Sequence, residues 1–222
     1  MTMTLTTLEK AALLSGKDVW QSRDLPHRGI ASFFMADGPH GVRKQVGSSD
    51  HLGINASEPA TCFPTAATIA NSWDTELAEQ VGTALGREAR ALDVDVLLGP
   101  GLNIKRSPLG GRNFEYFSED PYLSGKLAAA YVRGIQSQGV TATPKHLAVN
   151  SQELRRMASD SVLDEQTMRE LYCQGPVGTA RGRPAELPAG GHGNCPVMAS
   201  RSAHQGFGGV GHVRQCSVSS SG

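Results

Sequence analysis

The sequence has no excess of charge of either sign, because 21 lysine and arginine residues balance 21 aspartate and glutamate residues. Proteins that bind nucleic acid normally carry a basic patch and a high pI, so we expect no nucleic-acid partner. No run is long and apolar enough to span a bilayer, and no basic segment followed by an apolar core opens the chain. We therefore expect no membrane partner, no secretory signal and a cytoplasmic location.

Cysteine is scarce, and its four residues form no C-x-x-C pair and accompany no His-rich run. A zinc site is therefore not expected, and a disulfide framework is not expected in a chain of this size without a signal. A glycine-rich dinucleotide turn or phosphate-binding loop is also missing after every expected strand, which disfavours a nucleotide-binding or phosphate-binding α/β protein. We expect neither a metal nor a cofactor.

Hydrophobic periodicity up to about Tyr172 predicts strands that alternate with helices. Strands are expected over residues 30–36, 65–70, 94–98 and 140–143. Four helices are expected: one stopped by Gly16 with a Thr6–Glu9 capping box, one capped by Ser72 or Asp74, one from Asp120–Pro121 to Gly139, and one starting near Asp164. Such alternation implies parallel pairing. Four units make half of an eight-stranded barrel or a small open sheet.

Polar residues follow the expected strands. Asp37 follows the first, a loop containing Arg112 follows the third, and Lys145 and His146 follow the fourth. Barrel enzymes build their sites at these strand ends, which favours the barrel, although open sheets also bind ligands there. The loop of residues 111–121 holds an arginine, three acids and three aromatics. Because arginine donates in a fixed fork and carboxylates accept from hydroxyls, this clustering predicts a carbohydrate site.

Each of these residues also has a plainer interpretation. Asp37 is compatible with a turn residue at a strand end, and Lys145 and His146 with a solvated surface. Arg156, beside Arg155, is compatible with exposure to solvent. For three acids the alternative is catalytic instead: Glu115, Glu119 and Glu153 are each compatible with the role of a general acid.

The last part of the chain has a different composition. Residues 175–222 contain no Lys, Ile, Asp, Trp or Tyr, and Glu186 is their only acid. Such a segment buries too little apolar surface to offset the entropy of ordering its backbone, about 1–2 kcal/mol per residue. The expected division is a patterned domain over residues 1–174 and an irregular or frame-shifted tail over residues 175–222.

An ordered set of motifs gives the first part of the chain a family likeness. The motifs occupy residues 8–16, 37–43, 62–74, 97–121 and 143–157. In this order they resemble glycoside hydrolase family 3, in particular its bacterial β-glucosidases. The resemblance implies an α/β fold, here about the first half of a (β/α)8 TIM barrel. It also implies hydrolysis of terminal non-reducing β-D-glucosyl residues by a retaining, two-carboxylate route.

The resemblance further implies a set of substrate-binding residues. Asp37 would accept hydrogen bonds from two adjacent hydroxyls, and Arg112, Lys145 and His146 would donate to ring hydroxyls. Arg43 and Arg156 would orient the carboxylates and donors. The loop glutamates become structural, and Asp120 becomes a helix cap. The sequence after His146 lacks the extra histidine motif of the N-acetylglucosaminidase branch, which favours glucose.

The resemblance also implies that these 222 residues lack both catalytic carboxylates. The family's nucleophilic aspartate stands in a Ser-Asp-Trp motif, which this sequence does not contain, and the domain that supplies the acid/base glutamate has no counterpart. We therefore expect no catalytic residue and no hydrolysis by this chain alone. The alternative to a β-glucosidase is a non-catalytic sugar-binding remnant or a pseudogene product. Faint family likeness in the tail, near residues 195–200 and 205–210, favours frame errors beyond about Tyr172.

Overall fold

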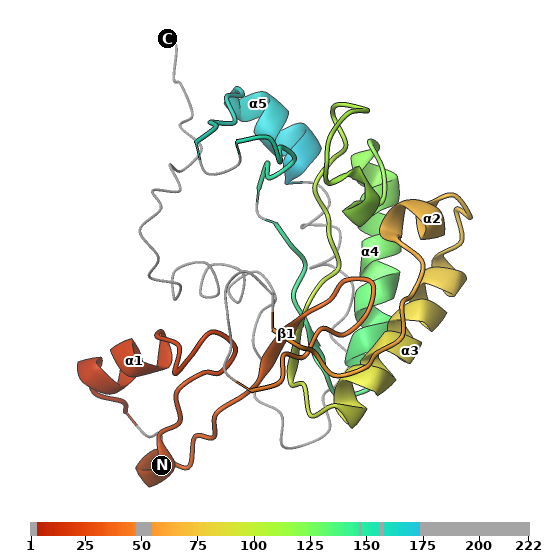
Figure 1. Ribbon diagram of the computed structural model, residues 1–222. Coiled ribbons are helices and arrows are strands. Elements are labelled where there is room, and N and C mark those ends of the chain that lie inside the picture. The colour runs from red at the N-terminus through yellow and green to blue at the C-terminus, as the bar shows by residue number, and fades with distance from the viewer. Residues whose placement is uncertain (1–3, 48–54, 147, 156–157, 174–222) are drawn as a thin grey trace.

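The computed structural model describes residues 4–47, 55–146, 148–155 and 158–173. Within this part, three parallel strands form one sheet, and two long helices lie side by side against it (Figure 1). The predicted α/β class with parallel pairing is therefore confirmed. In chain order the elements are α1 (Thr7–Leu13), η1 (Pro26–Arg28), β1 (Met35–Asp37), α2 (Ala66–Ala70), α3 (Thr75–Ala91), β2 (Val96–Leu98), η2 (Asn113–Glu115), α4 (Pro121–Gln136), β3 (Thr141–Ala142), α5 (Glu165–Thr167) and η3 (Met168–Tyr172).

The sheet has the order β1-β2-β3 and presents one apolar row to the helices. Ala36 pairs with Leu97, and Leu97 pairs with Ala142, so the three side chains lie next to one another across the strands. All three are fully buried and belong to the main hydrophobic core. Because side chains alternate along a strand, this register turns Asp37 away from the core and leaves it at the carboxyl end of β1.

The two long helices begin where the sequence predicts, because each has an aspartate cap. Asp74 accepts hydrogen bonds from the Glu76 and Leu77 amides, and Asp120 accepts from the Tyr122 and Leu123 amides. Each cap satisfies amides that have no partner within the helix. The predicted capping box of α1 is also confirmed, since Thr6 and Glu9 exchange both of its hydrogen bonds.

Helices α3 and α4 pack so closely that glycine is required at their crossing. A Cβ atom added to Gly82 would lie 2.3 Å from the backbone oxygen of Tyr131, and one added to Gly134 would lie 2.2 Å from that of Glu79. Arg133 strengthens the crossing through a hydrogen bond of 2.8 Å from its Nη2 atom to Glu79 Oε2. This crossing fixes the layer on which the sheet rests.

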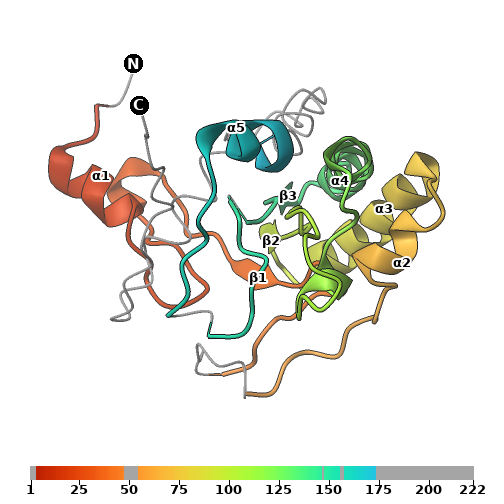
Figure 2. The same ribbon diagram turned by 90° about the horizontal axis from the view of Figure 1, so that it is seen from above.

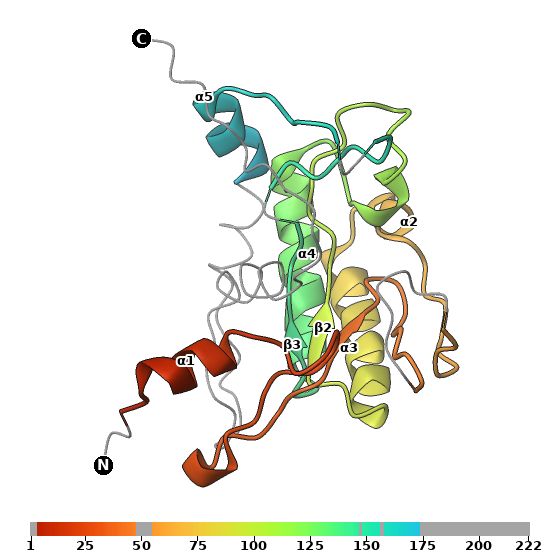
Figure 3. The same ribbon diagram turned by 60° about the vertical axis from the view of Figure 1, so that its left-hand side comes forward.

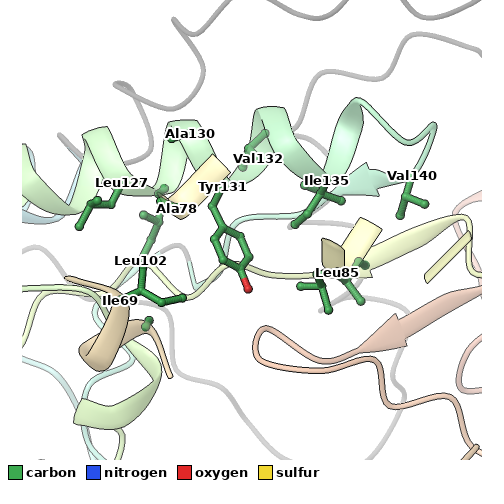
Figure 4. Close-up of a cluster of buried hydrophobic side chains, with 14 of the residues drawn as sticks. Ile69, Ala78, Leu85, Leu102, Leu127, Ala130, Tyr131, Val132, Ile135 and Val140 are labelled. Atoms are coloured by element: carbon green, nitrogen blue, oxygen red, sulfur yellow. The ribbon is translucent and has the colours of Figure 1, made fainter. Parts of the chain in front are cut away.

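The core between the helices and the sheet is made mainly of aliphatic side chains, together with the rings of Phe117 and Tyr131. Figure 4 shows part of this cluster. Tyr131 points from α4 toward the strands, and its hydroxyl donates a 2.8 Å hydrogen bond to the backbone oxygen of Pro39. Leu85 from α3 and Ile135 from α4 are fully buried in the same cluster. A polar link therefore runs through the core to the turn that follows β1.

One predicted strand is wrong. Residues 65–70 form helix α2, in which Thr65 is the N-cap and Ala66, Ile69 and Ala70 are buried. These three positions recur at helical spacing, and a short apolar run fits a strand or a buried helix equally well until its flanks are considered. The described residues consequently contain three strands of the sheet in place of the four expected.

The first predicted strand is shorter than expected. The apolar run predicts one strand over residues 30–36, but β1 covers only Met35–Asp37. Ile30 pairs instead with Leu25, and Phe34 with Gln21, in isolated antiparallel bridges. The beginning of this apolar run therefore folds back on the chain before it.

The N-terminal helix lies apart from the two long helices. In Figures 2 and 3 the sheet stands between α1 and the pair α3 and α4. No residue of α1 is buried in the described part of the chain.

Among the described residues, no helix combines the length and apolarity needed to cross a bilayer. The predicted helix near Asp164 is confirmed as α5, which continues into the π-helix η3.

Candidate functional site

The carboxyl ends of β1 and β3 bring an aspartate and a lysine together. Lys145 lies beyond β3, where its amide donates to the Pro100 oxygen at 3.0 Å and its carbonyl accepts from the Leu102 amide at 2.6 Å. These bonds continue the parallel ladder past the end of the strand and hold Lys145 in register. Its Nζ atom then lies 2.6 Å from Asp37 Oδ1, so residues 108 positions apart form an ion pair.

The turn after β1 depends on glycine. Gly38 has φ +136°, and a Cβ atom there would lie 2.0 Å from the backbone oxygen of Gly41. The turn closes through the Arg43 amide, which donates to the Asp37 oxygen at 2.8 Å. Within the turn, the backbone oxygen of Pro39 accepts a hydrogen bond from the Tyr131 hydroxyl. A side chain at residue 38 would open the turn and displace Asp37.

His40 attaches this turn to helix α2. Its Nε2 atom accepts a 3.0 Å hydrogen bond from the Ala66 amide, which requires that nitrogen to be unprotonated. Burial lowers the pKa of His40 below its ordinary value, and nearby Lys145 acts in the same direction. The carboxylates of Glu115 and Asp37 act in the opposite direction but do not outweigh burial. The ring is therefore a neutral structural acceptor, a partner that the sequence did not indicate.

The aromatic loop contributes a buried arginine and glutamate. Arg112 precedes η2, and its Nε and Nη2 atoms donate to Glu115 Oε2 at 2.9 Å and 2.6 Å. Burial alone would lower the pKa of Arg112, but the charge and hydrogen bond of Glu115 raise it overall, so the guanidinium stays charged. Among the described residues, its Nη1 atom is buried and has no hydrogen-bond partner. The predicted structural role of Glu115 agrees with these contacts.

Lys145 connects this pair to Asp37. Its Nζ atom lies 3.5 Å from Glu115 Oε1, in addition to its contact with Asp37. The Glu115 side chain is 6% exposed, whereas that of Asp37 is 39% exposed. The four charged groups therefore form one chain of alternating sign, with its carboxylate at Asp37 open to solvent.

His146, the residue after Lys145, contacts Arg112. Its Nε2 atom is 3.5 Å from Arg112 Nη2, and its Nδ1 atom is 3.2 Å from the Tyr116 hydroxyl and 3.4 Å from Asn103 Nδ2. The Tyr116 hydroxyl donates to the Asn150 oxygen at 2.8 Å. Burial raises the pKa of Tyr116, so its hydroxyl keeps its proton. These neighbours fix the orientation of the imidazole.

A cavity of about 560 Å³ lies over these groups. This is within the range of small-molecule sites, about 300–1,000 Å³. Charged side chains form one part of its wall, and the turn after β1, the segment before α2 and the exposed ring of Phe114 form the rest. The lining residues are Asp37, Gly38, Pro39, His40, Gly41, Val42, Arg43, Glu58, Ala60, Thr61, Cys62, Gly111, Arg112, Phe114, Glu115, Lys145 and Glu153.

The structure brings most of the predicted site residues together. Asp37, Arg43, Arg112 and Lys145 line the cavity, and His146 contacts Arg112 without lining it. Arg156 lies outside the described residues. Within those residues, no group of three or more His, Cys, Asp or Glu side chains is placed to hold a metal ion.

Sequence reasoning missed the wall formed by residues 58–62. This segment contributes Glu58, Thr61 and Cys62 to the cavity. A signal for it exists at Gly41, where a Cβ atom would lie 2.4 Å from the Thr61 oxygen. A glycine in a polar turn indicates a close approach of backbone, but it does not identify the segment that approaches.

Comparisons with known proteins agree on one family. Residues 25–172 match the family model of the glycosyl hydrolase family 3 N terminal domain. The chain is 59% identical over 168 residues to thermostable beta-glucosidase B of Acetivibrio thermocellus, covering 76% of this chain and 22% of that protein. It is 48% identical over 169 residues to exo-alpha-(1->6)-L-arabinopyranosidase of Bifidobacterium longum, again covering 76% of this chain and 22% of that protein.

A solved structure shows the same relation in three dimensions. Beta-glucosidase 3B of Thermotoga neapolitana, solved in complex with alpha-D-glucose, superposes with a TM-score of 0.72 at 39% sequence identity. The match covers 80% of this chain and 27% of that one. The chain thus spans about a quarter or less of the length of these relatives.

Proposed function

The chain belongs to glycosyl hydrolase family 3, and on that premise we propose that it supplies the sugar-binding side of a β-glucosidase active site. The reaction is hydrolysis of terminal non-reducing β-D-glucosyl residues. One observation carries the proposal. Asp37, Arg112 and Lys145 come from three separate segments and surround one cavity as linked donors and acceptors. A ring of hydroxyls, each of which both donates and accepts, is the ligand that such a surface complements.

The proposed roles follow from exposure and charge. Asp37 keeps its carboxylate open to solvent and accepts from adjacent hydroxyls while Lys145 holds it. Lys145 and Arg112, which both line the cavity, donate to the ring hydroxyls. A hydrogen bond to a charged group contributes about 1.5–3 kcal/mol. Arg43 and Arg156 orient these groups, and His146 acts as a donor or fixes the guanidinium of Arg112.

Bond cleavage needs two further carboxylates. In a retaining glycosidase one attacks the anomeric carbon and the other serves as acid and then base, about 5–5.5 Å apart. We assign neither role to a residue of these 222. The sequence has no Ser-Asp-Trp motif, and the acids at the cavity are already bonded to cations or exposed at its rim. The three described strands are proposed as part of a (β/α)8 barrel, with the family-like region over residues 1–174.

The proposed sugar is glucose. Support comes from the relative at 59% identity, named a beta-glucosidase, and from the glucose bound to the Thermotoga neapolitana enzyme. A relative at 48% identity is named an arabinopyranosidase, so family membership alone does not select the sugar. A panel of 4-nitrophenyl glycosides that includes β-D-glucopyranoside and α-L-arabinopyranoside distinguishes these substrates in a full-length relative carrying this sequence.

The binding role is tested on the 222-residue chain by titrating it with glucose and following backbone NMR signals. We expect signals of residues 37–43, 112–116 and 145 to shift in the wild type and to stop shifting in Asp37→Asn. Asp24→Asn is the matched control, because Asp24 is exposed and lies outside the cavity. Absence of any shift in the wild type, or equal responses of the two variants, would refute the proposed role.

A second candidate is a sugar-binding remnant without catalysis, which the missing Ser-Asp-Trp motif favours for this chain taken alone. Hydrolysis of 4-nitrophenyl β-D-glucopyranoside is measured for the 222-residue chain and for a full-length relative carrying this sequence. The β-glucosidase proposal expects activity in the longer protein alone, whereas a remnant supports activity in neither. Loss of key catalytic residues lowers turnover by about 10⁴-fold or more. A rate close to that of a full-length relative would exclude the remnant. The frame-error hypothesis for residues 175–222 is tested by the coding DNA, where a shifted frame should restore family-like sequence.

A further inference from the structure

Glu115 differs from the other carboxylates that line the cavity. Its side chain is only 6% exposed, and each of its two oxygens faces a different cation. Oε2 accepts from Arg112 at 2.9 Å and 2.6 Å, and Oε1 lies 3.5 Å from Lys145 Nζ. The two cations are 33 residues apart in the sequence and have Glu115 as their common partner. This carboxylate therefore sets the spacing between them.

Glu115 also balances charge inside the cavity. Arg112 and Lys145 are 12% and 15% exposed, so solvent screens them poorly. Asp37 neutralises part of the Lys145 charge, but Arg112 has Glu115 as its close carboxylate partner. Without Glu115, a mostly buried guanidinium would lose its hydrogen-bonded counter-charge and would keep only the weaker influence of Glu153. A buried cation in that state favours any anion that can reach it.

We propose that Glu115 is a positioning and specificity-determining residue that holds Arg112 and Lys145 for hydroxyl recognition and makes the cavity select neutral sugars over acidic ones. The inference rests on the proposed sugar-binding function and adds the class of sugar that the site rejects. The rejected class is the hexuronic acids, whose carboxylate would lie in the field of Glu115 and Asp37. Glu115 thus acts through the two cations and does not contact the reacting bond.

Two substitutions separate the two parts of this role. Glu115→Gln keeps the shape of the side chain and removes its charge. Glu115→Asp keeps the charge but shortens the side chain, so that it no longer reaches both cations. Glu119→Gln is the matched control, because it makes the same change in charge in the same loop at an exposed residue outside the cavity. Each variant is titrated with glucose and with glucuronate, and thermal melting followed by circular dichroism reports whether it folds.

We expect both Glu115 variants to bind glucose at least about 10-fold more weakly than the wild type, the effect of one charged hydrogen bond. Only Glu115→Gln should raise the ratio of glucuronate to glucose affinity, by about 10-fold or more on the same scale. Glu119→Gln should match the wild type for both sugars. A merely structural glutamate would change both affinities in parallel and would leave this ratio unmoved.

The remaining outcomes are each decisive. The specificity role is wrong if Glu115→Gln binds both sugars like the control. It is also wrong if Glu115→Gln binds glucose more weakly while the ratio of glucuronate to glucose affinity does not rise. If neither Glu115 variant folds, the residue is required for the fold and the positioning role is overturned. If the wild-type chain binds neither sugar, the proposed function fails first, and this inference falls with it.

Discussion

The crossing of α3 and α4 gives the sharpest prediction about stability, because two physical effects oppose each other at Gly82. In an exposed helix interior, alanine is favoured over glycine by about 1 kcal/mol. At Gly82 the added Cβ atom would lie 2.3 Å from the Tyr131 oxygen and 3.1 Å from the Tyr131 carbonyl carbon and Cα. All three neighbours are backbone atoms of α4 and cannot move aside like the end of a flexible side chain.

The magnitude follows from the displacement that the methyl group demands. An ordinary contact begins near 3.4 Å, so the two helices must separate locally by about 1 Å. Inserting a methyl group into a closely packed core costs about 1–3 kcal/mol. This cost exceeds the gain in helix propensity. At Gly134 an added Cβ atom would lie 2.2 Å from the Glu79 oxygen, so the close approach extends along the crossing. Because all three neighbours at Gly82 are backbone atoms, the cost should lie in the upper part of this range, about 2–3 kcal/mol. After the gain of about 1 kcal/mol in helix propensity, we expect Gly82→Ala to lower the free energy of unfolding by about 1–2 kcal/mol.

Urea unfolding followed by circular dichroism measures this change. Gln80→Ala is the matched control, because Gln80 is exposed on the same helix and this substitution also introduces alanine. The control should stay within about 0.5 kcal/mol of the wild type. Because Tyr131 also holds Pro39, the Gly82 variant should bind glucose more weakly. A Gly82→Ala chain as stable as the wild type, or more stable, would refute the packing argument.

Three further predictions concern single contacts. Tyr131→Phe removes only the hydroxyl that donates to Pro39, and we expect a loss of about 0.5–1.5 kcal/mol in urea unfolding together with weaker glucose binding; unchanged stability and binding would mean that this bond is dispensable. Asp120→Ala removes the cap of α4 and should cost about 1 kcal/mol, whereas an equal cost in an Asp24→Ala control would point to a general charge effect. The lowered pKa of His40 means that the unfolded chain binds its proton at a higher pH than the folded chain does. The contribution of neutral His40 to the free energy of unfolding should therefore be fully present above about pH 6.5. It should decrease as the pH falls toward the folded-state pKa. The difference in unfolding free energy between wild type and His40→Gln, measured from pH 7 to pH 5, should shrink along that range, and parallel profiles would contradict the assignment.

Local signals in the sequence predicted where α1, α3, α4 and α5 begin, because a few adjacent residues decide each of these helix starts. The caps at Asp74, Asp120 and Asp164 and the capping box of Thr6 lie where the sequence places them. The carboxyl ends of the three strands, and the polar residues that follow them, could also be predicted, because each apolar run stops at glycine or proline. The failure at residues 65–70 has the same origin, because six residues are too few for periodicity to separate a helix from a strand.

The sequence by itself determined the family, the α/β class and the kinds of side chain at the proposed sugar site. Only the tertiary structure decided how those side chains are paired. The contact of Lys145 with Asp37 and Glu115, the acceptor role of His40 and the link from Tyr131 to Pro39 each join residues that are 26 to 108 positions apart. Such pairs depend on the register of parallel strands and on the close crossing of two helices. Those are properties of the packed chain, and no local run of residues encodes them.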